Sequence, residues 1–493
     1  MKKKLLSLAV TAGMLASVGA VQAGMHINDK GTGEALIYPF YSAQGGNDTY
    51  VHVVNTTNVT KAVKVRFIEA SNSQEVLDFN LYLSPEDEWA AVITRNGTTG
   101  GAMVRTVDNS CTVPELGTSV GGHSGTKTTL ANGKVQRDQN FVRFNYQGDV
   151  DNSIERTTAG YIEIIEMGQL DPNTGLGADA VHNEAGVPNN CGNLRAAWNA
   201  GGTWVNNPAA QLLPWDGETS PSGGLWGYGV VINGADGTSV GYDAVAIDAF
   251  NDPEDALLLH YLPGDERPSL AQAQPTATIF DGNDANDYVF PTGYDAVSAL
   301  FMSANISNDY VVDPVINAQT NWVVTMPTKR FYVQGNTPVA PFTNVWSVKE
   351  GDDRETACES IGLEHWDREE AFTLVEGGFS PQPVEEDFEF QLCTEVSIIQ
   401  FSRDTSEESV LHASDRIRYG FEPGYTEGWA RISFDNLTSG SARSLAAING
   451  DVFRGLPATG FAVINYQNGD LDGVLSNYGA AVRHKSEQVI ILD

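Results

Sequence analysis

Few residues in this sequence have the type and spacing that catalysis requires. The segment Gly237-Thr-Ser239-Val-Gly241 matches the pattern of a nucleophilic serine turn, and His260 follows it as a conceivable base. That turn functions only where a strand ends sharply and a helix begins, which the flanking residues do not indicate. Chance matches are expected in a chain with 50 glycines. The sequence therefore favours a protein that is not an enzyme. A secreted hydrolase, with Ser239 or a carboxylate at its site, is an alternative.

Oxygen-bearing side chains crowd one short stretch of the chain. Its possible ligands for a metal ion are Asp281, Asn283, Asp284 and Asp287. Calcium prefers such carboxylate and amide oxygens, but the same residue types are the ones that turns select. Zinc is disfavoured, because the sequence contains neither H-E-x-x-H nor C-x-x-C. Calcium is the only cofactor that the sequence suggests, and the main expectation is no cofactor.

Tryptophans cluster near an irregular stretch, residues 171–223, that is rich in Asn, Gly and Pro. They are Trp198, Trp204, Trp215 and Trp226. Such rings can form a platform on which a sugar or another ligand stacks. More often they hold a loop in place by packing beneath it, and we favour that explanation. The adjacent cations Lys329 and Arg330 could bind an acidic partner or could form an ion pair within the protein. We favour the internal ion pair.

The N-terminus has the pattern of a removable export signal. Three lysines precede an apolar run over residues 5–21, and Val21-Gln22-Ala23 supplies the small residues of a cleavage site. We therefore expect a signal peptide over residues 1–23 and a mature protein in the periplasm, at the cell surface or outside the cell. No later stretch approaches 18 apolar residues, so we expect no membrane insertion of the mature chain.

Four cysteines in an exported chain favour disulfides. Pairing of sequence neighbours is the simplest of the three possible connectivities, joining Cys111 with Cys191 and Cys358 with Cys393. The chain is strongly acidic, with 29 Lys and Arg against 63 Asp and Glu. This charge would repel nucleic acid and anionic lipid, so neither is expected as a partner.

The segments that must position these residues have the sequence pattern of β-strands. Leu77, Phe79, Leu81 and Leu83 alternate with polar residues, which predicts a strand with one face in a core and the other in water. The expected fold class is mostly β, with one or two β-sandwich-like domains and long disulfide-pinned loops. The expected domains cover residues 24–265, with the irregular insertion at 171–223, and residues 276–493, with an acidic bridged hairpin at 349–409.

Several segments resemble an uncharacterised family of exported, β-rich envelope or cell-surface proteins of proteobacteria. They include Tyr50-Val-His-Val-Val-Asn-Thr56, Lys64-Val-Arg-Phe-Ile-Glu69, Trp322-Val-Val-Thr, Pro327-Thr-Lys-Arg330 and Gly455-Leu-Pro457. The resemblance spans most of the mature chain and implies a location in the envelope or at the cell surface, without implying any chemistry.

We therefore expect a secreted or cell-surface protein with a structural or adhesive role and no enzymatic activity. Its expected partners are other copies of itself or a surface glycan. A carbohydrate- or ligand-binding module is the first alternative, and a secreted hydrolase is the second.

Overall fold

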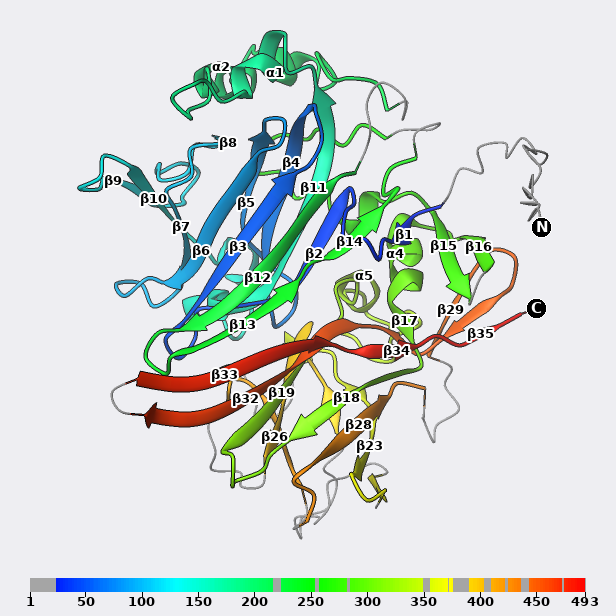
Figure 1. Ribbon diagram of the computed structural model, residues 1–493. Helices are drawn as coiled ribbons and strands as arrows, with labels where there is room; N and C mark the ends of the chain where they lie inside the picture. The colour runs from blue at the N-terminus through cyan, green and yellow to red at the C-terminus, as the bar shows by residue number, and fades with distance from the viewer. Residues whose placement is uncertain are drawn as a thin grey trace, which may run out of the picture.

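The structure is a computed structural model that is built mainly of strands (Figure 1). It describes residues 24–215, 223–252, 257–281, 284–348, 355–370, 372–375, 390–402, 409–421, 424–435, 443–471 and 474–492. The predicted signal peptide and Asn283 lie outside the described residues. The mostly-β fold class is confirmed. None of the described helices is long and apolar enough to cross a membrane.

Two seven-stranded antiparallel sheets form the N-terminal half. Sheet 1 has the order β1 (His26–Ile27), β14 (Val245–Asp248), β2 (Ala35–Ser42), β11 (Ala159–Leu170), β4 (Thr60–Glu69), β5 (Glu75–Leu83) and β8 (Cys111–Val113). Sheet 2 has the order β13 (Thr238–Asp243), β12 (Leu225–Asn233), β3 (Asn47–Asn55), β6 (Glu88–Arg95), β7 (Ala102–Thr106), β10 (Val135–Asn140) and β9 (Gly125–Thr129).

One hydrophobic core joins these two sheets. Val63 and Val65 of β4 contribute to it from sheet 1, and Val51 and Val53 of β3 contribute from sheet 2. Successive side chains of a strand point to opposite faces, so the alternation in the sequence identified the core face correctly.

The opposite face of sheet 1 does not face water, and our expectation for it was wrong. Lys64, Arg66 and Asn80 are buried there. The segment that follows β14 covers Lys64 and Asn80: Lys64 Nζ donates to the carbonyls of Leu262 and Asp265, and Asn80 Nδ2 donates to the carbonyl of Tyr261. The pattern of a strand shows which residues share a face, but not which distant segment covers that face.

Three short helices cover another part of the same face (Figure 1). They are α1 (Gly175–Ala180), α2 (Cys191–Ala197) and α3 (Thr203–Asn206), and they lie within the stretch that we expected to be irregular. A disulfide between Cys111 and Cys191 ties α2 to β8. The second disulfide joins Cys358 and Cys393, so both pairs follow the predicted connectivity.

Two five-stranded sheets form most of the C-terminal half, and a second core lies between them. Sheet 3 has the order β24 (Phe372–Val375), β23 (Gly362–Asp367), β28 (Glu427–Ser433), β18 (Asn305–Val311) and β34 (Lys485–Glu487). Sheet 4 has the order β27 (Ile417–Gly420), β26 (Val396–Ser402), β19 (Ala318–Thr325), β32 (Thr459–Leu471) and β33 (Val474–Arg483). Strands β26 and β27 run parallel, and the other pairs are antiparallel.

The central strands of sheet 4 are buried on both faces because they contribute to both cores. Trp322 and Val324 of β19 belong to the C-terminal core, whereas Val323 between them belongs to the N-terminal core. Phe461 of β32 stacks on Tyr242 of β13, with ring centroids 4.7 Å apart. The two halves are therefore joined through a shared layer.

A third cluster of buried residues packs against β2, β11 and β14. It contains residues of α4 (Gly293–Phe301) and of the hairpin formed by β15 (Thr276–Asp281) and β16 (Asp284–Val289). Leu270 and Ala273 from the expected boundary region near residue 270 are also buried in it.

The remaining elements are short. They are the helices η1 (Phe144–Tyr146), η2 (Ile154–Thr158), η3 (Leu270–Gln272) and α5 (Arg330–Val333), and the strands β17 (Met302–Ser303), β20 (Ser347–Val348), β21 (Glu355–Thr356), β22 (Glu359–Ser360), β25 (Gln391–Leu392), β29 (Ser444–Ala446), β30 (Val452–Arg454), β31 (Leu456–Pro457) and β35 (Ile490–Ile491).

Candidate functional site

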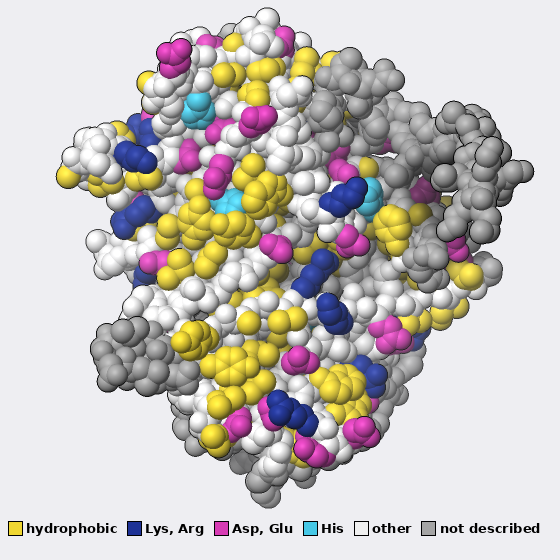
Figure 2. Space-filling view, viewed as in Figure 1, with side chains coloured by type: hydrophobic (Ala, Val, Ile, Leu, Met, Phe, Trp, Pro, Cys, Tyr) yellow, Lys and Arg dark blue, Asp and Glu magenta, His cyan; other side chains and the backbone are white. Residues whose placement is uncertain are grey.

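The outer face of sheet 2 carries a group of aromatic side chains on two neighbouring strands. We call this group the aromatic patch; it consists of Tyr50 and His52 on β3 and Trp226 and Tyr228 on β12. Residues two apart in a strand share a face, and the register places Tyr228 opposite His52. Figure 2 shows hydrophobic side chains gathered around a histidine over these strands.

The rings of the aromatic patch contact one another and remain partly open to solvent. The centroid of His52 lies 3.8 Å from that of Tyr228 and 5.1 Å from that of Trp226. Trp226 is 37% exposed, and Tyr50 and Tyr228 are half-buried. Along β12 the apolar face continues through Ile232, which is 40% exposed. A patch of this kind on a sheet face commonly marks a binding surface.

His52 is buried beneath the neighbouring rings of the aromatic patch. Neither of its ring nitrogens has a hydrogen-bond partner among the described residues. Burial lowers the pKa of His52, and the carboxylate of Glu88 partly offsets this effect. The Nδ1 atom of His52 lies 3.9 Å from Oε1 of Glu88, whose side chain is 54% exposed. The aromatic patch thus combines open ring faces with hydroxyl groups and a carboxylate at its edge.

The four tryptophans singled out in the sequence do not come together. Trp198 and Trp204 are buried against the outer face of sheet 1, where Trp198 Nε1 donates to the hydroxyl of Tyr82 and Trp204 stacks on the Tyr82 ring. They hold the α1–α3 segment in place, as the favoured explanation proposed. Trp215 is half-buried farther along that segment, and only Trp226 belongs to the aromatic patch.

The sequence reasoning missed Tyr50, His52 and Tyr228. Their spacing contained a usable signal, because Trp226 and Tyr228 alternate along one strand and Tyr50 and His52 alternate along another. The pairing of β3 with β12 joins segments far apart in the sequence, so the sequence could not show that the two sets meet.

A second aromatic pair, Trp366 and Trp429, was also missed. These residues lie opposite each other on β23 and β28, with stacked rings 4.0 Å apart. Trp429 is 39% exposed, and the guanidinium of Arg431 lies 5.2 Å from the Trp366 ring. A smaller group of hydrophobic side chains is visible over these strands in the lower part of Figure 2.

The candidate calcium ligands lie in the β15–β16 hairpin. Asp284 and Asp287 are exposed and three residues apart in β16, so their side chains lie on opposite faces of the strand. Asp287 Oδ1 accepts a hydrogen bond from Thr278 Oγ1, and Asp281 pairs with Asp284 across the hairpin. Within the part of the chain that the structure describes, no three His, Cys, Asp or Glu side chains are grouped to hold a metal ion.

The serine considered for a hydrolase lies in a strand. Ser239 belongs to β13 and pairs with Ile232 of β12, so it does not occupy a strand-to-helix turn. His260 is buried elsewhere, where its Nε2 contacts the hydroxyl of Tyr82 and its Nδ1 contacts the carbonyl of Pro208. The two residues are not brought together as nucleophile and base.

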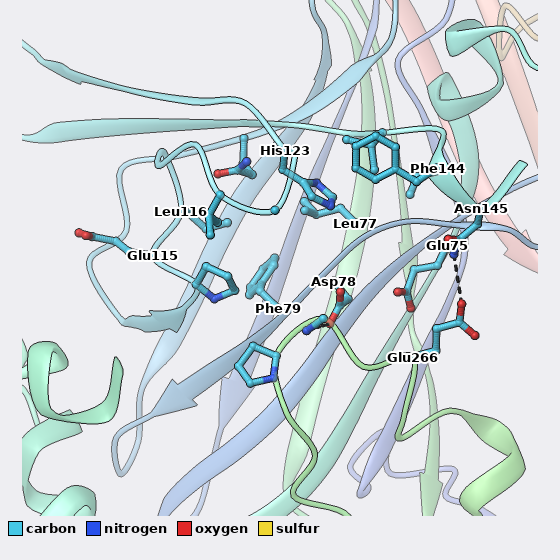
Figure 3. Close-up of a pocket in the computed structure, with 18 residues that line it drawn as sticks. Glu75, Leu77, Asp78, Phe79, Glu115, Leu116, His123, Phe144, Asn145 and Glu266 are labelled. Atoms are coloured by element: carbon cyan, nitrogen blue, oxygen red, sulfur yellow. Dashed lines mark hydrogen bonds between the residues drawn. The ribbon is translucent and has the colours of Figure 1, made fainter. Parts of the chain in front are cut away.

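A cavity of about 420 Å³ opens at the edge of sheet 1 (Figure 3). Strand β5, the segments on both sides of β9 and β10, and residues 263–266 line it. Its apolar side chains include Leu77, Phe79, Leu116 and Phe144, and its carboxylates are Glu75, Asp78, Glu115 and Glu266. In Figure 3 the side chain of Glu115 points away from the other three carboxylates.

We compared the chain with protein-family models, with curated proteins and with solved structures. No protein-family model, no curated protein and no solved structure matches it.

Proposed function

We propose that this chain is an exported, non-enzymatic adhesion protein that binds a neutral polysaccharide through the aromatic patch. The observation that carries the proposal is the presence of partly open rings of Tyr50, Trp226 and Tyr228 on adjacent strands of one sheet face. Export is supported by the signal sequence and is compatible with the two disulfides.

A sugar ring presents an apolar face of C–H groups and an edge of hydroxyl groups. Tyr and Trp suit both parts, since each offers a large apolar ring and a polar group at one end. Their few rotatable bonds also keep the entropy cost of binding low. Glu88 at the edge of the aromatic patch offers an acceptor for sugar hydroxyls.

The charge of the chain favours a neutral partner. The formal net charge is −34 at pH 7, which would repel a polyanion. An uncharged polysaccharide avoids this repulsion and can contact several rings at once. Weak contacts at each sugar unit then combine along the polymer, as an adhesive surface requires.

Affinity electrophoresis of the mature protein in gels containing a soluble neutral polysaccharide tests the proposal. We expect retardation of the wild type by at least one member of a panel of neutral glucans, mannans and xylans. Trp226→Ala and Tyr228→Ala should each weaken retardation about tenfold, because each removes a ring that packs on the sugar.

Phe280→Ala is the matched control, since Phe280 is an aromatic residue that is 59% exposed on β15, outside the aromatic patch. It should leave retardation unchanged. Equal retardation of the Trp226→Ala variant and the wild type, or no retardation by any polymer of the panel, would contradict the proposal.

A further inference from the structure

The cavity at the edge of sheet 1 adjoins a buried group of charged residues in which the carboxylates outnumber the cations. Arg66 Nε donates to Glu75 Oε2 at 2.6 Å, and Arg66 Nη1 donates to Glu163. Lys64 Nζ lies 2.8 Å from Asp78 Oδ2. All five side chains are at most 9% exposed. Two cations thus face three carboxylates, and buried charges are costly unless they are balanced.

Glu75 lines the cavity and has a carboxylate oxygen that can still accept a hydrogen bond. Its side chain is 8% exposed, and only its Oε2 accepts a hydrogen bond from the described residues. Asp78 is more fully engaged, because its Oδ2 also accepts from the backbone N–H of Gly264. Burial raises the pKa of Glu75 to about 7 in spite of Arg66, as expected of a carboxylate that lacks a full counter-charge.

The rest of the cavity wall suits an organic cation. None of the residues described as lining the cavity is Lys or Arg. His123 lies with its ring centroid 5.7 Å from that of Phe144, and its Nδ1 is buried without a hydrogen-bond partner among the described residues. Burial lowers the pKa of His123, which favours the neutral ring, and a neutral imidazole has a nitrogen that can accept a hydrogen bond.

We propose that this cavity binds a small amine, whose ammonium group supplies a positive charge beside Glu75. The apolar body of the amine packs between Phe79, Leu116 and Phe144. A volume of about 420 Å³ falls within the usual range for pockets that bind small molecules. This site is separate from the aromatic patch and does not depend on its function.

Isothermal titration of the mature protein with 2-phenylethylamine, and with the neutral 2-phenylethanol as comparison, tests the proposal. The wild type should bind the amine at least tenfold more tightly than the alcohol. Binding of the amine should tighten about tenfold between pH 6 and pH 8, because a bound ammonium favours the ionised form of Glu75. The other charged or titratable groups around Glu75 are Arg66, Lys64, Asp78, Glu163, His123, Glu115 and Glu266.

Glu75→Gln should reduce amine affinity at least tenfold and remove most of its pH dependence. Glu184→Gln, an exposed change outside the cavity, should alter neither. Phe144→Ala keeps the test decisive if the Glu75 variant folds poorly, since Phe144 is 47% exposed and its loss should weaken binding without unfolding the protein. Equal affinity for alcohol and amine, unchanged binding in the Phe144→Ala variant, or no binding at millimolar amine would overturn the proposal.

Discussion

Glu395 and Lys329 are buried where the two halves of the molecule meet. The backbone N–H of Glu395 donates to the carbonyl of Ala70 in the N-terminal half, and Lys329 Nζ donates to the carbonyl of Cys393. Burial raises the pKa of Glu395 to about 8 and lowers that of Lys329 to about 8, although each attracts the other. Lys329 and Arg330 are internal, so neither presents a cationic surface to a partner.

The raised pKa of Glu395 predicts a pH dependence of folding stability. Glu395 keeps its proton in the folded state up to about pH 8, whereas the unfolded chain releases it near pH 4.5. The folded state binds more protons between these values, so this group makes stability fall as the pH rises from about 4.5 to about 8.

Glu395→Gln should remove that loss. In urea unfolding, the free energy of unfolding of the variant minus that of the wild type should rise by about 1.4 kcal/mol for each pH unit between pH 5.5 and pH 8. The exposed change Glu184→Gln should give the same difference at both pH values. A pH-independent difference for the Glu395 variant would show that this carboxyl titrates normally.

Sequence reasoning at the residue scale predicted the cysteine pairs correctly, but it did not predict the buried charges of sheet 1. Lys64 and Arg66 alternate with Val63 and Val65, which is also the pattern of a strand exposed on one face. Lys64 is covered by residues 262–265, nearly two hundred positions later. The same long-range pairing hid Tyr50, His52 and Tyr228 from the predicted site.

At the scale of elements, α1–α3 depend on a covalent link. These helices are each too short to be stable alone, and they are held against sheet 1 by Trp204 and by the bond between Cys111 and Cys191. The strands were easier to predict than the helices α1–α3. Alternation of apolar and polar residues is a local signal, whereas a helix of one or two turns shows little periodicity in the sequence.

Replacing Cys111 and Cys191 together by Ser should lower stability by about 3–5 kcal/mol, because the bond spans 80 residues. Limited proteolysis should then cleave first between residues 171 and 215. The matched variant, with Cys358 and Cys393 replaced by Ser, opens a bond that spans 35 residues and should leave that stretch protected. Cleavage there in both variants alike would contradict a local role for the first bond.

At the scale of the whole molecule, sheet 4 contributes to both cores, so we expect the two halves to unfold cooperatively. Phe461 is buried, and its ring connects β32 to β13 through Tyr242. Phe461→Ala should destabilise the protein by about 3–5 kcal/mol. Hydrogen exchange should show protection lost to the same extent in β4 and in β28.

Tyr478→Ala is the control for this prediction, because Tyr478 is 62% exposed on the neighbouring strand β33. It should leave both strands protected. Loss of protection in β28 alone would mean that the halves unfold independently.

The shared layer also means that the N-terminal half cannot complete its core until a late segment of the chain is in place. The chain emerges from the ribosome N-terminus first, and strand β19 pairs with β26 on one side and with β32 on the other. Residues 459–466 of β32 are made more than 130 residues after β19. Until β32 is in place, part of the apolar surface of the N-terminal half lacks its cover, which exposes that surface to aggregation while the chain folds.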